Sequence, residues 1–166
     1  TWALYTDARY HWGPMQVGLS LMTVGVLSGL VQATLVKKIV PRIGEARAVV
    51  IGFTISILSM LGYGLASQGW MIYVIIVIGA FAGISQPALQ AYITKHVPAN
   101  EQGAVQGVYS GLASLAGIPG PIIGTFILGW ATGPGQSHYL AGSSFFAGAA
   151  LTILALYLAI RTFRRD

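Results

Sequence analysis

The 28 residues 103–130 contain no charged side chain, and this run constrains the fold more than any other feature of the sequence. A stretch of that length and hydrophobicity predicts a membrane-spanning helix, because about 20 apolar residues cross the hydrocarbon core of a bilayer. Small residues recur in it every three or four positions, which predicts close contact with another helix: Gly103, Gly107, Gly111, Ser114, Gly117, Gly120 and Gly124. Pro119 and Pro121 remove backbone donors, so we expect a bend near 117–120.

The composition indicates an all-α membrane protein. Hydrophobic residues make up 55% of the chain and charged residues only 8%, whereas soluble domains carry about a quarter charged residues. The absence of cysteine excludes a disulfide framework and a thiolate metal site. No Asp, Glu or His lies within a predicted full span, so we expect neither an enzyme nor a metal or cofactor site.

Five apolar runs predict five full spans, at 15–36, 48–66, 70–94, 103–130 and 139–160. Residues 1–8 resemble the end of a further helix, followed by an interfacial aromatic cluster of Trp2, Tyr5, Tyr10 and Trp12. The expected connections are a basic loop at 37–47, a turn at 67–69, a loop at 95–101 with Asn100 as a helix cap, and a turn at 131–138. Because the chain begins at Thr1 without an initiator Met, we expect a piece of a longer protein.

The basic residues predict the orientation in the membrane. The loop at 37–47 and the segments at 95–101 and 161–166 hold eight Lys and Arg, whereas the opposite side holds only Arg9. Cytoplasmic loops carry such an excess, so we expect a multi-pass protein of the cell (inner) membrane with a cytoplasmic C-terminus. The net charge of +5 is explained by these segments, and nucleic-acid binding is not expected.

Several local motifs are similar to those of one transporter family. They are the run 2–12 with 17–20 after it, Gly44-Glu45, Gly69-Trp70, Pro87-Ala88-Leu89-Gln90, Gln102-Gly103, Gln106-Gly107 and the Gly-Pro segment 117–124. Together they resemble the tetracycline/proton antiporter group of the major facilitator superfamily. The resemblance implies that residues 1–166 form the carboxy-terminal six-helix half of a twelve-helix transporter, with the first helix truncated.

The function implied by the resemblance is proton-coupled efflux of a small organic compound such as a tetracycline-like drug. Its partners would be the substrate, protons, the lipid bilayer and the missing amino-terminal half. The alternatives are a major facilitator transporter of another solute and a non-transporting membrane module. The spans that contain residues 32, 70 and 103 are expected to line a central cavity, with the second and fifth spans outside.

The resemblance has two departures. The cytoplasmic loop motif of the superfamily is retained at Arg42 and Gly44, but Lys37 and Pro41 stand in place of its first Gly and its Asp. Ser56 stands where tetracycline exporters often carry a carboxylate. A hydroxyl does not titrate near neutral pH, so we expect the proton-coupling carboxylate to lie outside the five full spans.

Two groups of residues are the candidates for function. Polar side chains inside spans either line a substrate pathway or bond neighbouring helices, and the candidates are Gln32, Gln86, Gln90, Gln106 and Tyr109. The expected bend gives the second group, which either gates the pathway or serves ordinary helix packing: Gly117, Pro119, Gly120, Pro121 and Gly124.

Overall fold

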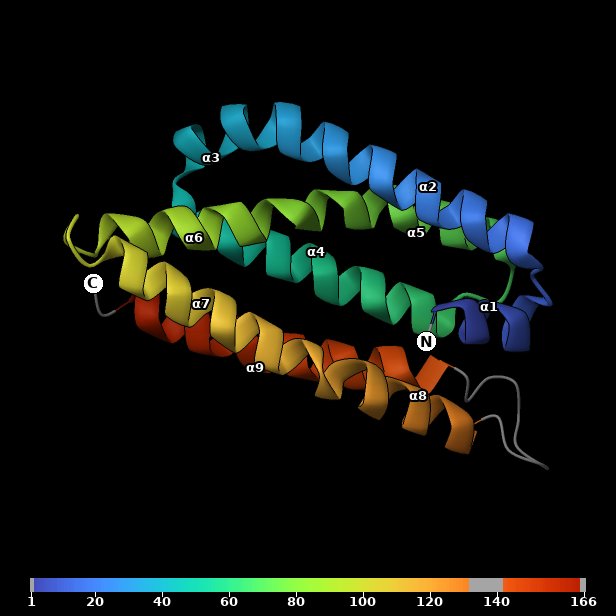
Figure 1. The fold of residues 1–166 in the computed structure, drawn as a ribbon. Helices are drawn as coiled ribbons and strands as arrows, with labels where there is room; N and C mark the ends of the chain where they lie inside the picture. Colours follow the sequence, from blue (N-terminus) through green and yellow to red (C-terminus); the bar gives the residue numbers. More distant parts are fainter. Residues whose placement is uncertain (1, 132–141, 165–166) are drawn as a thin grey trace.

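The computed structural model describes residues 2–131 and 142–164, and every regular element within them is a helix (Figure 1). The elements are α1 (Trp2–Tyr10), α2 (Pro14–Leu30), η1 (Val31–Val36), α3 (Lys37–Ile43), α4 (Glu45–Leu65), α5 (Gly69–Ala80), η2 (Phe81–Ile84), α6 (Ser85–Lys95), α7 (Gln102–Gly117), α8 (Pro119–Ala131) and α9 (Ser143–Phe163). The all-α fold class expected from the sequence is confirmed.

Five continuous helical segments are long and apolar enough to cross a membrane, as the five apolar runs predict. They are Pro14–Ile43, Glu45–Leu65, Gly69–Lys95, Gln102–Ala131 and Ser143–Phe163. The turn expected at 131–138 and the first residues of the span expected at 139–160 lie outside the described residues, apart from Ala131, which ends α8.

Helix α4 forms the centre of the packing, with α5 and α6 on one side and α9 on another (Figure 1). Gly52 allows the approach of α6, since a Cβ atom at this position would lie 2.6 Å from the Cβ atom of Ser85. Gly64 does the same for α9, where a Cβ atom would lie 2.6 Å from the ring of Phe146. Small residues on α4 therefore let two neighbouring helices come close.

Residues 37–43 form helix α3 rather than part of the expected basic loop, so that interpretation is wrong. Val36, Val40 and Ile43 pack on Ala48, Val49 and Ala88 of α4 and α6. This apolar stripe keeps the chain helical through Pro41, whose ring lies within α3. Only Gly44 remains as a connection, and its φ of 84° and ψ of 153° fall in a region that favours glycine.

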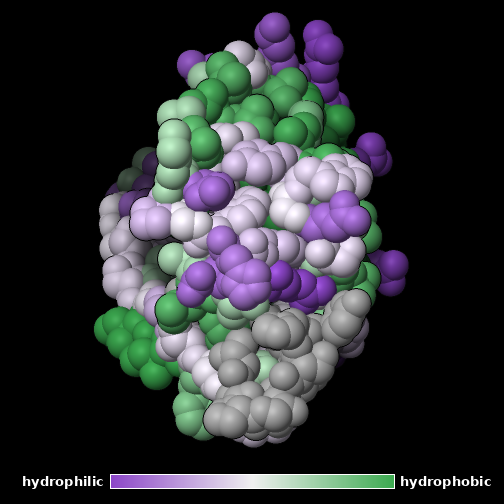
Figure 2. Space-filling view, turned by 90° about the vertical axis from the view of Figure 1, so that its right-hand side faces the viewer, coloured by the Kyte–Doolittle hydropathy of each residue, from purple (hydrophilic) through white to green (hydrophobic). Residues whose placement is uncertain are grey.

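The two ends of the bundle differ in chemistry. Apart from Arg9, the described Lys and Arg residues gather at the end that carries α3, the α6–α7 connection and the end of α9, and we call it the basic end (Figure 1). Arg9 lies in α1 at the opposite end, which we call the aromatic end. Figure 2 views the aromatic end and shows weakly and strongly hydrophilic residues across the middle, with hydrophobic residues above them and along parts of the edge.

The aromatic cluster joins helices and is more than an interfacial anchor. Tyr5 is fully buried and packs at 4.7 Å between ring centres against Phe145 of α9. Its hydroxyl donates to the Tyr63 carbonyl at the end of α4, and the Tyr10 hydroxyl donates to the Ala66 carbonyl at 2.7 Å. α1 is therefore tied to the last turn of α4 by side-chain donors.

Three spans depart from a regular α-helix. η1 is a wider π-helical segment, and η2 is a 3-10 segment that precedes Pro87. Proline has no N–H to reach back to the Gly83 carbonyl, which accounts for the irregular turn there. The third break separates α7 from α8 at Ile118, within the stretch where the sequence predicts a bend. Glu101 is the residue at the N-cap position of α7. The prediction that Asn100 caps this helix is therefore wrong.

Candidate functional site

A row of polar side chains lies where α6 faces α7, and we call it the glutamine seam. It consists of Gln86 and Gln90 on α6 and of Gln102, Gln106 and Tyr109 on α7. Gln86 and Gln90 are one helical turn apart and therefore share a face of α6. The Tyr109 hydroxyl donates to the Gln86 side-chain oxygen, which links the two helices directly.

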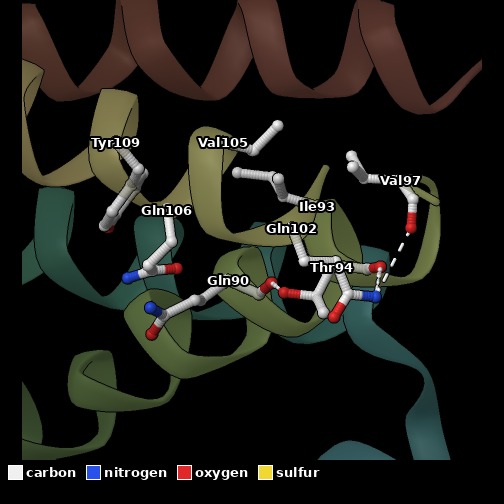
Figure 3. Close-up of a pocket in the computed structure, with 8 residues that line it drawn as sticks. All are labelled: Gln90, Ile93, Thr94, Val97, Gln102, Val105, Gln106 and Tyr109. Carbon is white, nitrogen blue, oxygen red and sulfur yellow. Dashed lines mark hydrogen bonds between the residues drawn. The ribbon is translucent and has the colours of Figure 1, made fainter. Parts of the chain in front are cut away.

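The seam encloses a cavity of about 10 Å³ between the two helices. Figure 3 shows the Gln90 and Gln106 amide groups pointing to the same side of this pocket. Gln102 closes the far end by donating to the Thr94 carbonyl at 3.3 Å and to the Val97 carbonyl at 3.4 Å. A cavity of this size holds about one water molecule, and its polar walls suit one.

The seam is also accessible from the surface. A shallow depression of about 560 Å³ is lined by Gln90, Thr94 and Gln102, together with Pro87 and Lys95. Gln90, Thr94, Val97 and Gln102 line both hollows, so the two lie side by side. Gln90 therefore borders both the cavity and the surface depression.

The remaining candidates from the sequence lie elsewhere. Gln32 is exposed on the π-helical segment η1 and does not line the described pockets of the seam. Gly117, Pro119, Gly120 and Pro121 lie at the α7–α8 break, and Gly124 lies one turn further on. A Cβ atom added at Gly117 or Gly120 would meet no described atom within 4 Å. This face of the break is open in the structure.

A second polar cavity lies between α2, α4 and the α5–η2 segment, and sequence reasoning did not identify it. Its volume is about 170 Å³, and the hydroxyl groups of Ser28, Ser56, Ser59 and Tyr63 line it. Ser59 is 6% exposed, and its Oγ atom has no hydrogen-bond partner in the described part of the chain. Gly79 keeps the space free, since a Cβ atom there would lie 3.1 Å from Ser59 Oγ.

One ion pair ties α4 to α6 at the basic end. Lys95, the last residue of α6, bonds the Glu45 carboxylate at the start of α4. Gly44, retained from the loop motif, precedes that carboxylate directly, while Arg42 lies in the last turn of α3. This ion pair thus holds the start of α4 and the end of α6 together, and Lys95 also lies at the rim of the seam.

The fold defines the class of protein: an all-α, multi-pass membrane protein whose polar groups lie between its spans. The model of one family, the Major Facilitator Superfamily, matches residues 2–166. The chain belongs to this superfamily.

Several curated relatives share the same part of the sequence. Tetracycline resistance protein class C of Escherichia coli is 33% identical over 93% of this chain and 38% of its own length. The class D protein of Salmonella ordonez is 33% identical over 96% of this chain and 40% of its own length. Hippocampus abundant transcript-like protein 1 of Rattus norvegicus is 26% identical over 95% of this chain and 34% of its own length.

The chain thus spans about two fifths of the length of the tetracycline resistance proteins that it matches. Its resemblance to the tetracycline group, inferred from local motifs, agrees with these matches. No solved structure matches the chain.

Proposed function

We propose that this chain is the carboxy-terminal half of a secondary transporter that exports a small organic compound in exchange for protons. The observation that carries the proposal is the 33% identity to tetracycline resistance proteins over nearly the whole chain. The glutamine seam supports it, because amide and phenol groups between spans offer donors and acceptors to an organic solute without adding charge.

In this proposal Gln86, Gln90, Gln106 and Tyr109 line the substrate pathway. The bond between Tyr109 and Gln86 joins α6 to α7 and is released when a solute takes the amide. Gln32 belongs to the same pathway from a different helix. Its place in a π-helical turn supports a role in binding, since such turns are frequent at functional sites.

The α7–α8 break is the proposed gate. Gly117 and Gly120 present backbone without side chains, and Pro119 and Pro121 prevent a regular helix through this point. The missing amino-terminal half covers this open face in one state of the alternating cycle and withdraws from it in the other. Small residues permit both arrangements, because no side chain must move aside.

Proton coupling is assigned to a carboxylate outside the five spans of this chain. Asp7 lies at the aromatic end, Glu45 is held by Lys95, and Glu101 caps α7 at the basic end. None of these three lies in the middle of a span. A group that exchanges protons with both sides of the membrane in turn must lie there. We place the basic end in the cytoplasm of the cell (inner) membrane, following the distribution of Lys and Arg.

The test measures tetracycline uptake by everted membrane vesicles that contain the full-length protein, with and without an imposed pH gradient. The proposal expects gradient-dependent uptake, and its absence for tetracycline and for other amphipathic solutes would exclude proton-coupled export. Gln86→Leu and Gln90→Leu are expected to raise the KM by about tenfold, because a lost polar contact costs about 1.5 kcal/mol.

The matched control is Gln16→Leu, which makes the same chemical change at an exposed position in the first turn of α2. It is expected to leave the KM within about twofold of the original. Equal KM values for all three variants would show that the seam only bonds the helices together, while leaving the transport function itself intact.

A further inference from the structure

A groove of about 310 Å³ lies between the start of α4 and the end of α9, at the basic end of the bundle. Its walls are apolar and come from both helices, chiefly Val50 and Ile51 of α4 and Ile160 and Phe163 of α9. The side chain of Ile51 is 43% exposed, so the groove opens to the outside of the bundle.

Two arginines line the same groove. Arg47 belongs to α4, and Arg164 directly follows Phe163, the last residue of α9. Both side chains are exposed, and they come from antiparallel helices that pack along each other. Glu45, two residues before Arg47, is bonded to Lys95 of α6, and Asp166 lies outside the described residues. The described groups that line the groove therefore carry positive charge only.

The flank of the bundle next to the groove is suited to lipid. Ile153 and Tyr157 of α9 are more than half exposed, as is Leu58 of α4. Ile153 and Tyr157 lie seven positions before Ile160 and Arg164, and therefore on the same face of α9. Leu58 likewise lies seven positions after Ile51, so these residues continue the surface of the groove toward the middle of the two helices. A long apolar chain that enters the groove can follow this surface without meeting a charged group.

We propose that the groove binds one anionic phospholipid, with the phosphate of its headgroup between Arg47 and Arg164 and an acyl chain along Ile51 and Ile160. Guanidinium groups bind phosphate oxygens in a bidentate manner, and basic pockets between spans attract anionic headgroups. An anionic phospholipid matches both parts of the groove. Its negative phosphate suits the arginine pair, and its acyl chain suits the apolar walls.

The proposal does not depend on transport, since it concerns the outer flank of the fold and not the glutamine seam. It also separates an anionic lipid from the other possible occupants. A zwitterionic lipid would gain nothing from the net charge of the arginine pair, and free phosphate would leave the apolar walls exposed. A second copy of the chain would bring further positive charge to the same place.

The experiment uses the full-length protein purified in mild detergent and mixed with equal amounts of phosphatidylglycerol and phosphatidylcholine that carry the same acyl chains. Native mass spectrometry then counts the lipids retained. We expect one preferentially retained phosphatidylglycerol. Arg47→Gln and Arg164→Gln should each lower its retention about fivefold, and the double variant about twentyfold or more.

Arg161→Gln is the matched control, because it removes the same charge from the same turn of α9 without lining the groove. It should change the retention by less than about twofold. Ile51→Trp fills the apolar part and keeps both arginines, so it should also lower the retention of phosphatidylglycerol. Unchanged yield and elution volume establish that each variant is folded.

Four results of the retention experiment would overturn the proposal, and so would one change in oligomeric state. They are equal retention of the two lipids by the original protein, an equal loss in the Arg161→Gln variant, displacement of the lipid by millimolar sodium phosphate, and unchanged retention in the Ile51→Trp variant. A dimer that dissociates when Arg47 and Arg164 are both replaced would likewise overturn it, because the groove would then be an interface between two copies.

Discussion

Helices α4 and α7 both carry repeated glycines, yet the two sets of glycines have different surroundings. On α4, Cβ atoms at Gly52 and Gly64 would approach atoms of α6 and α9 to 2.6 Å. On α7, Cβ atoms at Gly103, Gly107 and Gly111 would meet no described atom within 4 Å. The described part of the chain contains no buried residue in α7, whereas α4 has five.

A stripe of small residues in a membrane helix therefore does not by itself show whether another helix of the same chain packs on it. The stripe on α4 is used within this chain, where it allows neighbouring helices to approach. The stripe on α7 is unused within the described fold, so its partner must be lipid or a segment outside these residues. Adding a methyl group at a glycine of each stripe distinguishes the two cases. The expected change in the free energy of unfolding decreases from Gly52 on α4 through Gly44 and Tyr5 to Gly120.

Gly52→Ala is expected to have the largest effect, a loss of about 2–3 kcal/mol. The added methyl group would lie 2.6 Å from Ser85 Cβ and 2.9 Å from the Ser85 backbone nitrogen, so α4 and α6 must move apart. The measurement is unfolding by a denaturing detergent, followed by circular dichroism. Gly107→Ala is the control on α7 and should stay within about 0.5 kcal/mol of the original protein. Equal losses at both positions would contradict the comparison.

Gly44→Ala is expected to cost about 1–2 kcal/mol, although the space around Gly44 is open. The cause is the backbone, since a φ of 84° with a ψ of 153° is adopted almost only by glycine. The same unfolding experiment measures it. Gly83→Ala is the control, because Gly83 has equally open surroundings and no positive φ. A similar loss of stability in that variant would show that backbone strain does not explain the effect at Gly44.

Tyr5→Phe is expected to cost about 1 kcal/mol, because it removes the hydroxyl that donates to the partly buried Tyr63 carbonyl. This change tests whether α4 depends on its contacts at the aromatic end as well as along its length. Tyr157→Phe is the control, at a side chain that is 59% exposed. A loss of stability at Tyr157 that matches the loss at Tyr5 would argue against the role of the bond.

Gly120→Leu should have the smallest effect on stability, within about 0.5 kcal/mol, since its surroundings are open. In the full-length protein, however, we expect it to abolish transport while membrane insertion is retained, because the proposed gate could no longer close against the other half. Uptake by everted vesicles provides the measurement. Transport equal to that of the original protein would show that the open face at the α7–α8 break is not a gate.

The fold could be predicted from the sequence where one local property decides it. Apolar length identifies the five spans, and Pro119 and Pro121 identify the break in the fourth. α3 could not be predicted in the same way, because Lys37, Lys38 and Arg42 conceal the apolar positions that pack on α4. A helix can continue through charged residues when the apolar residues between them pack on a neighbouring helix, as Val40 and Ile43 do.

The candidate site was predictable only in part. Spacing alone places Gln86 and Gln90 on one face of α6, but the bond from Tyr109 depends on how α7 packs. The cavity lined by Ser28, Ser56 and Ser59 was missed, because serine is common in spans and its hydroxyl often bonds the preceding turn. Only the three-dimensional packing shows that Ser59 Oγ has no such partner among the described residues.

The π-helical segment η1 is equivalent to an insertion of one residue into an otherwise regular helix. In a regular helix Lys38 would follow Val31 by seven positions and share its face, which packs on Ala80 and Ile84. The wider turn rotates everything after it by about 100°, so that Lys38 turns outward and Val40 reaches α4. Deleting one residue between 31 and 36 would therefore produce a regular helix in which Lys38 still points outward and Val40 still packs on α4.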